Sequence, residues 1–94
     1  MSDPEARRGY EQARLAFELG GRVRNLREQH GVSQSELARR IGSTQPSIAR
    51  LEAGGVTPSL ETLDRIATAF GLDLIVRFDQ EKRPSGGKRS RRSA

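Results

Sequence analysis

The chain has 94 residues, enough for one domain, and 33% of them are hydrophobic. Mean hydropathy is −0.72, no apolar run approaches the roughly 18 residues of a membrane span, and no signal-peptide pattern opens the chain, so we expect a cytoplasmic protein without membrane contact. Cysteine is absent and His30 is the only histidine, which excludes disulfides and leads us to expect neither a metal site nor a cofactor.

Positive charge is concentrated beyond residue 79. Residues 1–79 carry 11 arginines and 11 acidic residues, whereas residues 80–94 carry six basic residues and one glutamate. The net charge of +5 therefore belongs to the end of the chain and does not by itself indicate that the globular part binds nucleic acid. Residues 80–94 are rich in Lys, Arg, Ser, Gly and Pro, and we interpret them as a disordered basic tail.

The first third of the chain is rich in good helix formers. Apolar residues recur there at helical spacing, namely Leu15, Leu19, Val23 and Leu26. Gly20 and Gly21 interrupt this run at a cost of about 1 kcal/mol each. We therefore expect an N-terminal lead-in helix within residues 1–19 and a first core helix over about 20–29, although the two could form one kinked helix.

Two further helices are predicted on either side of a short turn. Ser33-Gln34-Ser35-Glu36 has the sequence of a capping box. The helix that it starts is expected to run to Ile41, and Gly42 can then supply a positive φ for a tight turn. Thr44 is a suitable cap for the next helix, and Pro46 is tolerated in its first turn.

A fourth helix and a strand are expected after the turn helices. The start signal Thr57-Pro58-Ser59 predicts the helix, and Gly71 ends it. Residues 72–79 then change to a two-residue period, which is typical of a strand. Its apolar row consists of Leu72, Leu74, Val76 and Phe78. A strand needs a neighbour, and no other segment has this pattern. We therefore expect the protein to dimerise through this strand, which pairs antiparallel with the same segment of a second copy.

The centre of the chain meets the requirements of a helix-turn-helix. Two steeply crossing helices need a short turn and a small residue at their contact, and Gly42 and Ala38 stand at those places. Apolar anchors follow at consistent spacing, namely Leu37, Ile41, Ile48 and Leu51. The predicted fold is all-α, a repressor-like helix-turn-helix domain of four to five helices with one C-terminal β-strand. In this prediction residues 20–71 form the DNA-binding domain and 72–79 the dimerisation strand.

The stretch GVSQSELARRIGSTQPSIARLEAG resembles the Cro/repressor (XRE) helix-turn-helix family, over about residues 20–71. The resemblance implies that Gln34 holds a DNA phosphate, that the third helix faces the major groove, and that Arg27 and Glu52 form a buried structural ion pair. The DNA-binding candidates are Gln34, Ser43, Thr44, Gln45, Ser47 and Arg50. Pro46 departs from the family pattern, in which a longer polar residue often reads a base.

The chemistry of the third helix agrees with this resemblance. Glutamine suits bidentate contact with adenine and arginine with guanine, and Gln45 and Arg50 supply these groups. Thr44 and Ser47 can contact phosphate, together with the amides of the helix N-terminus. No base, nucleophile or metal ligand accompanies the carboxylates of the motif, so an enzyme is not expected.

The predicted function is sequence-specific binding of double-stranded DNA by a homodimer at a palindromic operator, with transcriptional repression as the outcome. Helices followed by a lone strand are also similar to antitoxin regulators of the HipB and HigA type. That similarity implies a toxin protein as partner, which could add a strand at residues 72–79, and autoregulation of the operon. A third possibility is an adaptor that uses this fold to bind proteins.

Overall fold

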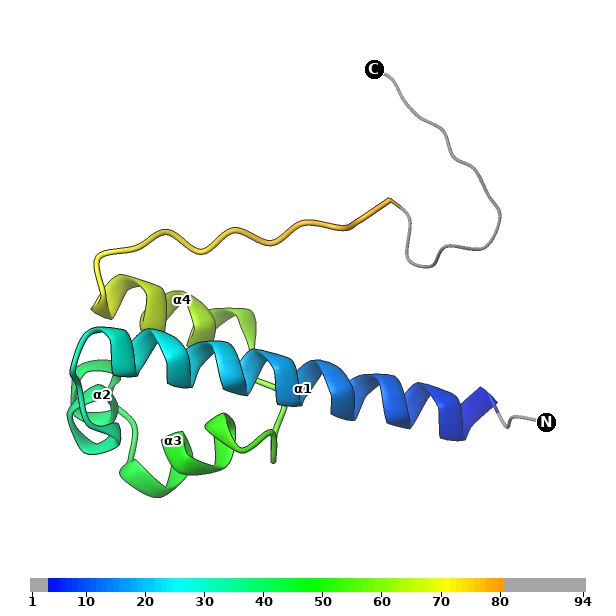
Figure 1. The fold of residues 1–94 in the computed structure, drawn as a ribbon, viewed down its shortest axis with the longest axis horizontal. Helices are drawn as coiled ribbons and strands as arrows, with labels where there is room; N and C mark the ends of the chain where they lie inside the picture. Colours follow the sequence, from blue (N-terminus) through cyan, green and yellow to red (C-terminus); the bar gives the residue numbers. More distant parts are fainter. Residues whose placement is uncertain (1–3, 81–94) are drawn as a thin grey trace, which may run out of the picture.

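A computed structural model describes residues 4–80, and these residues form an all-helical fold (Figure 1). Within this range there are four helices, which are α1 (Pro4–Gln29), α2 (Gln34–Ile41), α3 (Gln45–Glu52) and α4 (Leu60–Ala69). α1 lies between α4 on one side and the α2–α3 pair on the other in Figure 1. The all-α prediction is confirmed for this part of the chain, in which no helix is long and apolar enough to cross a membrane.

The first helix is continuous over 26 residues, which agrees with the single-helix alternative and not with a lead-in helix and a separate core helix. Gly20 explains the difference, because α1 lies directly against the end of α3 at this point. A Cβ atom at Gly20 would lie 2.3 Å from the Leu51 carbonyl oxygen and 2.8 Å from that of Glu52. The glycine therefore allows a close helix contact, and that packing offsets its low helix propensity.

The starts of α2, α3 and α4 follow the capping signals of the sequence. The Ser33, Thr44 and Ser59 hydroxyls accept backbone N–H groups of the first turns, at distances of 3.0, 3.3 and 3.0 Å respectively. These bonds satisfy amides that have no partner inside a helix. In a capping box, Glu36 would also accept a hydrogen bond from the backbone N–H of Ser33. In the structure its carboxylate instead accepts hydrogen bonds from Arg39 and Arg40.

The core lies where the four helices meet. Leu37 and Ile48, one from each helix of the predicted motif, are almost completely buried at 0% and 1% exposure. The buried cluster consists of Val23, Leu37, Ala38, Ile41, Ile48, Leu51 and Ile66. All the anchors predicted for the helix-turn-helix are among them, so the core that fixes α2 against α3 follows directly from the apolar spacing.

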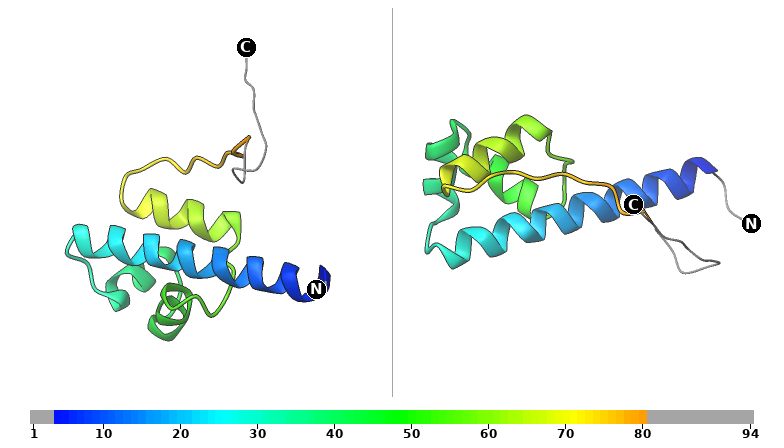
Figure 2. Two further views of the ribbon diagram at one scale, coloured as in Figure 1. Left: turned by 45° about the vertical axis from the view of Figure 1, so that its right-hand side comes forward. Right: turned by 90° about the horizontal axis from the view of Figure 1, so that it is seen from above.

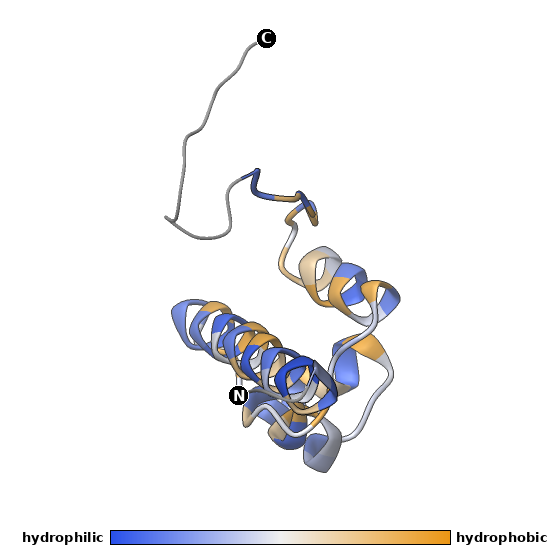
Figure 3. Ribbon diagram, turned by 90° about the vertical axis from the view of Figure 1, so that its right-hand side faces the viewer, coloured by the Kyte–Doolittle hydropathy of each residue, from blue (hydrophilic) through white to orange (hydrophobic). Residues whose placement is uncertain are grey.

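Beyond α4 the chain is extended and doubles back along the helices (Figures 1 and 2). The expected C-terminal β-strand over residues 72–79 is not formed within residues 4–80. The physical reason is that a strand is defined by pairing with a neighbour, and the described part of the chain supplies none. Apolar and polar residues nevertheless alternate along the segment, except that Ile75 is apolar in the otherwise polar row, and Figure 3 shows both kinds by colour. The predicted basic tail lies outside the described residues, except for Gln80.

Candidate nucleic-acid interface

The turn between α2 and α3 has the geometry that a helix-turn-helix requires. Gly42 has φ 71°, in the left-handed region that favours glycine. The Ser43 amide then donates to the Ala38 carbonyl at 2.8 Å, closing the C-terminus of α2. Ala38 is buried at the contact between the helices, and its small side chain allows α3 to cross α2 closely.

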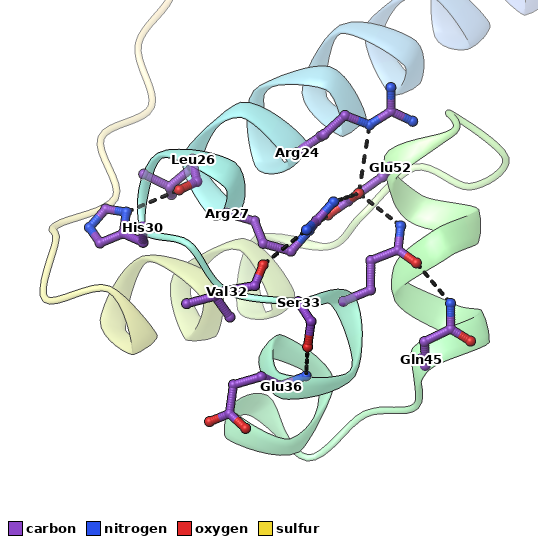
Figure 4. A network of polar contacts seen from close by, with 10 residues as sticks. Arg24, Leu26, Arg27, His30, Val32, Ser33, Glu36, Gln45 and Glu52 are labelled. Atoms are coloured by element: carbon purple, nitrogen blue, oxygen red, sulfur yellow. Dashed lines mark hydrogen bonds and ion pairs between the residues drawn. The ribbon is translucent and has the colours of Figure 1, made fainter.

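An ion pair holds α3 from behind. Arg27 of α1 makes two hydrogen bonds to the Glu52 carboxylate, from Nε to Oε2 at 2.7 Å and from Nη2 to Oε1 at 2.9 Å. Its remaining Nη1 donates to the Val32 carbonyl at 2.9 Å, and the Glu52 side chain is fully buried (Figure 4). The structure thus brings together the two residues that the family resemblance pairs, and the contact joins α1 to the C-terminus of α3.

Burial and hydrogen bonding oppose one another at Glu52. Burial alone raises the pKa of this carboxyl, but hydrogen bonds from Arg27 and Gln34 and the charges of Arg27 and Arg24 lower it, and the net pKa lies below its usual value. The Arg24 guanidinium contributes from 3.8 Å. Glu52 therefore stays ionised, and an ionised carboxylate can only accept hydrogen bonds.

A chain of amides leads from Glu52 to the exposed start of α3. Gln34 Nε2 donates to Glu52 Oε1 at 3.0 Å, and Gln34 Oε1 accepts from Gln45 Nε2 at 2.8 Å. We call this series the Glu52–Gln34–Gln45 relay. Because the carboxylate only accepts, Gln34 must turn its NH₂ group inward, so its carbonyl faces Gln45. Gln45 must then donate, which leaves one N–H and the carbonyl of its amide free.

The other candidates lie around the relay on α3 and the turn. Thr44, Gln45, Ser47 and Arg50 are exposed, and Ser43 is half-buried. Thr44 Oγ1 donates to Ser47 Oγ at 2.9 Å, so these two hydroxyls act as a pair. The aliphatic stem of Arg50 lies over the following loop, where a Cβ atom at Gly55 would be only 3.1 Å from Arg50 Cγ. This packing holds the base of the Arg50 side chain while its guanidinium reaches solvent.

Two members of this arrangement were not foreseen from the sequence. One is the contact between Gln34 and Gln45, which are 11 residues apart and were expected to act separately. The other is Arg24 beside Glu52, for which a signal existed, since Arg24 and Arg27 are three residues apart and share one helix face. The relay had no such signal, because its geometry depends on how α2 crosses α3.

These features define a DNA-binding helix-turn-helix, and comparison with known proteins identifies the family. The profile of the helix-turn-helix family matches residues 23–76, more than half of the chain. The chain therefore belongs to this family, of the Cro/repressor (XRE) type.

Similar proteins are named as regulators. The HTH-type transcriptional regulator PuuR of Escherichia coli is 32% identical over 65 residues, which cover 69% of this chain and 35% of PuuR. A regulator of Archaeoglobus fulgidus is 38% identical over 65% of this chain and 90% of its own length, and one of Methanothermobacter thermautotrophicus is 43% identical over 56% and 77%. This chain thus spans about a third of PuuR. Residues 23–76 thus form a helix-turn-helix domain of the kind found in DNA-binding transcriptional regulators.

Proposed function

We propose that this protein is a dimeric transcriptional repressor that reads a palindromic operator with α3 in the major groove. The observation that carries the proposal is the Glu52–Gln34–Gln45 relay, which orients an exposed amide at the first residue of the recognition helix. A side chain held in one orientation before binding loses less entropy when it contacts a base. A protein with this role acts in the cytoplasm, with the DNA.

The free groups of Gln45 match adenine. Adenine presents an acceptor, N7, and a donor, the N6 amino group, in the major groove. The remaining N–H of Gln45 can donate to N7 while its carbonyl accepts from N6. Arg50, with five donors and no acceptor, suits the two acceptors of guanine instead. The two residues therefore specify different base pairs of one half-site.

Contacts to phosphate would position α3 in the groove. Gln34 contacts Gln45, the first residue of α3, and Thr44 and Ser47 place a pair of hydroxyl groups at the start of the same helix, which Ser43 precedes by two residues. The amides at the start of α3 add partial positive charge, which favours phosphate. Such contacts set register and orientation but carry no base information, so they complement Gln45 and Arg50.

The dimer forms through residues 72–79. Their exposed apolar side chains include Val76 at 60% and Phe78 at 97% exposure, and the extended backbone has no strand beside it within residues 4–80. Antiparallel pairing of two copies would bury the apolar side chains and give hydrogen-bond partners to the backbone N–H and C=O groups. A two-fold axis then presents two recognition helices to half-sites about 34 Å apart.

Footprinting on the DNA upstream of the protein's own gene would locate an operator, and two variants then test the readout. Gln45→Ala and Arg50→Ala should each weaken the operator by about 1–3 kcal/mol more than random DNA, the discrimination of one bidentate contact. Arg39→Ala is the matched control, because Arg39 is exposed on α2 and paired with Glu36. Equal losses on operator and random DNA would mean that Gln45 and Arg50 contact only phosphate.

The exposed segment 72–79 also supports a second function, that of an antitoxin. Its apolar side chains and free backbone suit a partner protein that adds a strand to this edge. Co-expression with the product of an adjacent gene distinguishes the two functions. Relief of growth arrest by the Gln45→Ala, Arg50→Ala double variant would show an inhibitory role independent of operator binding, whereas no effect of the neighbour on growth would leave repression alone.

A further inference from the structure

An open apolar groove of about 340 Å³ lies between α1, α4 and the start of the extended segment. Leu19 and Leu26 of α1 form one wall, Leu63 lies on α4, and residues 72–75 of the extended segment form the opposite wall. Figure 3, seen along α1, shows the extended segment above α4 and set apart from α1. The groove is therefore bounded on three sides and has room along the edge of the extended segment.

Exposure along the segment indicates which side chains belong with the groove. Leu74 is half-buried, whereas its neighbour Ile75 is 81% exposed. Side chains of an extended chain alternate between two faces, so the even-numbered row faces the helices. Further along that row, Val76 and Phe78 are exposed at 60% and 97%. Leu72 is also exposed, at 46%, so Leu74 is the one half-buried member of the row, beside a groove that is not filled.

We propose that the groove receives Val76 and Phe78 of a second copy, in a single register fixed by Asp73 lying opposite the partner's Arg77. The inference rests on the proposed dimer and adds to it the pairing of each residue and the occupant of the groove. The partner's segment adds antiparallel to the free edge, on the side of α1. Its even-numbered row then points toward the same helices.

Geometry limits the possible registers. Residues directly opposite in an antiparallel pair point to the same face, and a slip by one residue would set the apolar row against the polar one. A two-fold axis through Ile75 pairs Leu74 with the partner's Val76 and Leu72 with the partner's Phe78. All four apolar residues are then matched, and Val76 and Phe78 lie over the groove beside Leu72 and Leu74, which line it.

Charge selects the same register. With the axis at Ile75, Asp73 lies opposite the partner's Arg77, and symmetry repeats this pair. Moving the axis to Val76 sets Asp73 against the partner's Asp79, which is repulsive, and moving it to Leu74 leaves Arg77 opposite the partner's Gly71. Arg77 now lies 3.7 Å from Asp79 of its own chain, with both side chains largely exposed. Such a surface pair contributes little, so exchanging it for the partner's Asp73 is not costly.

Charge reversal tests the register. Asp73→Arg and Arg77→Asp should each weaken the homodimer about tenfold, because two attractive cross-strand pairs become repulsive. An equal mixture of the two variants should regain the wild-type dimer constant, since every 73–77 pair in the mixed dimer joins opposite charges. Asp79→Arg is the matched control, with the same change of charge, and should leave the dimer constant unchanged. Sedimentation equilibrium measures all four.

The outcomes separate the register from the proposed function. A wild-type dimer whose mixed variants fail to recover overturns the register and leaves the dimer intact. A wild-type monomer at micromolar concentration overturns both, although operator binding by the monomer would still be measurable. Phe78→Ala provides an independent test, because it should weaken the wild-type dimer. Adding the same substitution to the monomeric Asp73→Arg variant should leave the free energy of unfolding unchanged. If Phe78→Ala leaves the dimer constant as it was, the partner's Phe78 does not occupy the groove.

Discussion

The back of α3 and the segment 72–79 differ in whether their side chains find partners within the same chain. Behind α3, the buried charge of Glu52 has hydrogen bonds from two side chains, and every link is made within one chain. Along 72–79, side chains as apolar as Phe78 are exposed to solvent. In the proposed function, DNA readout is therefore prepared within one copy, whereas assembly needs a second molecule. Variants in the two regions should therefore affect different measurements.

The largest effect is expected from breaking the ion pair behind α3. Glu52→Ala leaves the Arg27 guanidinium nearly buried without its carboxylate, and removal of one partner of such a pair costs about 3–5 kcal/mol. Chemical denaturation should show this loss, with Glu28→Ala, an exposed position on the same helix as Arg27, as the control. Unchanged stability would contradict the structural role of the pair.

The close contact of α1 with α3 offers a second comparison between adjacent residues. Gly20→Ala places a Cβ atom 2.3 Å from the Leu51 carbonyl oxygen, so the helices must separate, at a cost of about 1–3 kcal/mol. Gly21 has no atom near its added Cβ, and Gly21→Ala should stabilise the protein by up to about 1 kcal/mol through helix propensity. Thermal unfolding should move in opposite directions for the two variants, and a shift in the same direction would mean that α1 does not contact α3 in this way.

Substitutions in the extended segment should affect assembly more than folding. Replacing Leu74 and Val76 together by Asp puts charge into the proposed interface, so we expect monomers and weaker operator binding. The helical core should unfold at nearly the same temperature in dilute solution, because neither residue belongs to the buried cluster. Leu60→Asp, an exposed position on α4, is the control. Dimers that persist in the double variant would place the interface elsewhere.

The smallest effect concerns the exposed cluster on α2. Hydrogen bonds from Arg39 and Arg40 lower the pKa of Glu36 from 4.5 to about 2. A lowered pKa in the folded state means that this contribution is complete above pH 4.5 and is lost as pH falls through about 2. Glu36→Gln should therefore flatten the acid side of the stability profile slightly, because exposed pairs contribute little. A profile identical to wild type between those values would show that the pairs are not maintained in solution.

Local rules account for what could be predicted from the sequence. The caps at Ser33, Thr44 and Ser59 and the buried anchors of α2 and α3 depend on spacing within one or two turns. Of the two arrangements expected around Gly20, separate helices were wrong, because propensity is local, whereas the compensating contact with Leu51 comes from a distant segment. The relay was missed for the same reason, since Gln34 and Gln45 meet only after the helices cross. The strand was predicted from a pattern that needs a partner to become a sheet.

The relay also has a consequence for how this protein can acquire a new operator. In the relay, position 45 donates to the Gln34 carbonyl, so a change there to Glu or to an apolar residue would disturb the proposed phosphate contact of Gln34 and the proposed base contact of position 45 together. Arg50 is held through its aliphatic stem over Gly55, and its guanidinium does not have to satisfy another side chain as the Gln45 amide does. Divergence of binding sites among descendants of this sequence should therefore begin at position 50, with position 45 changing only after Gln34 has changed.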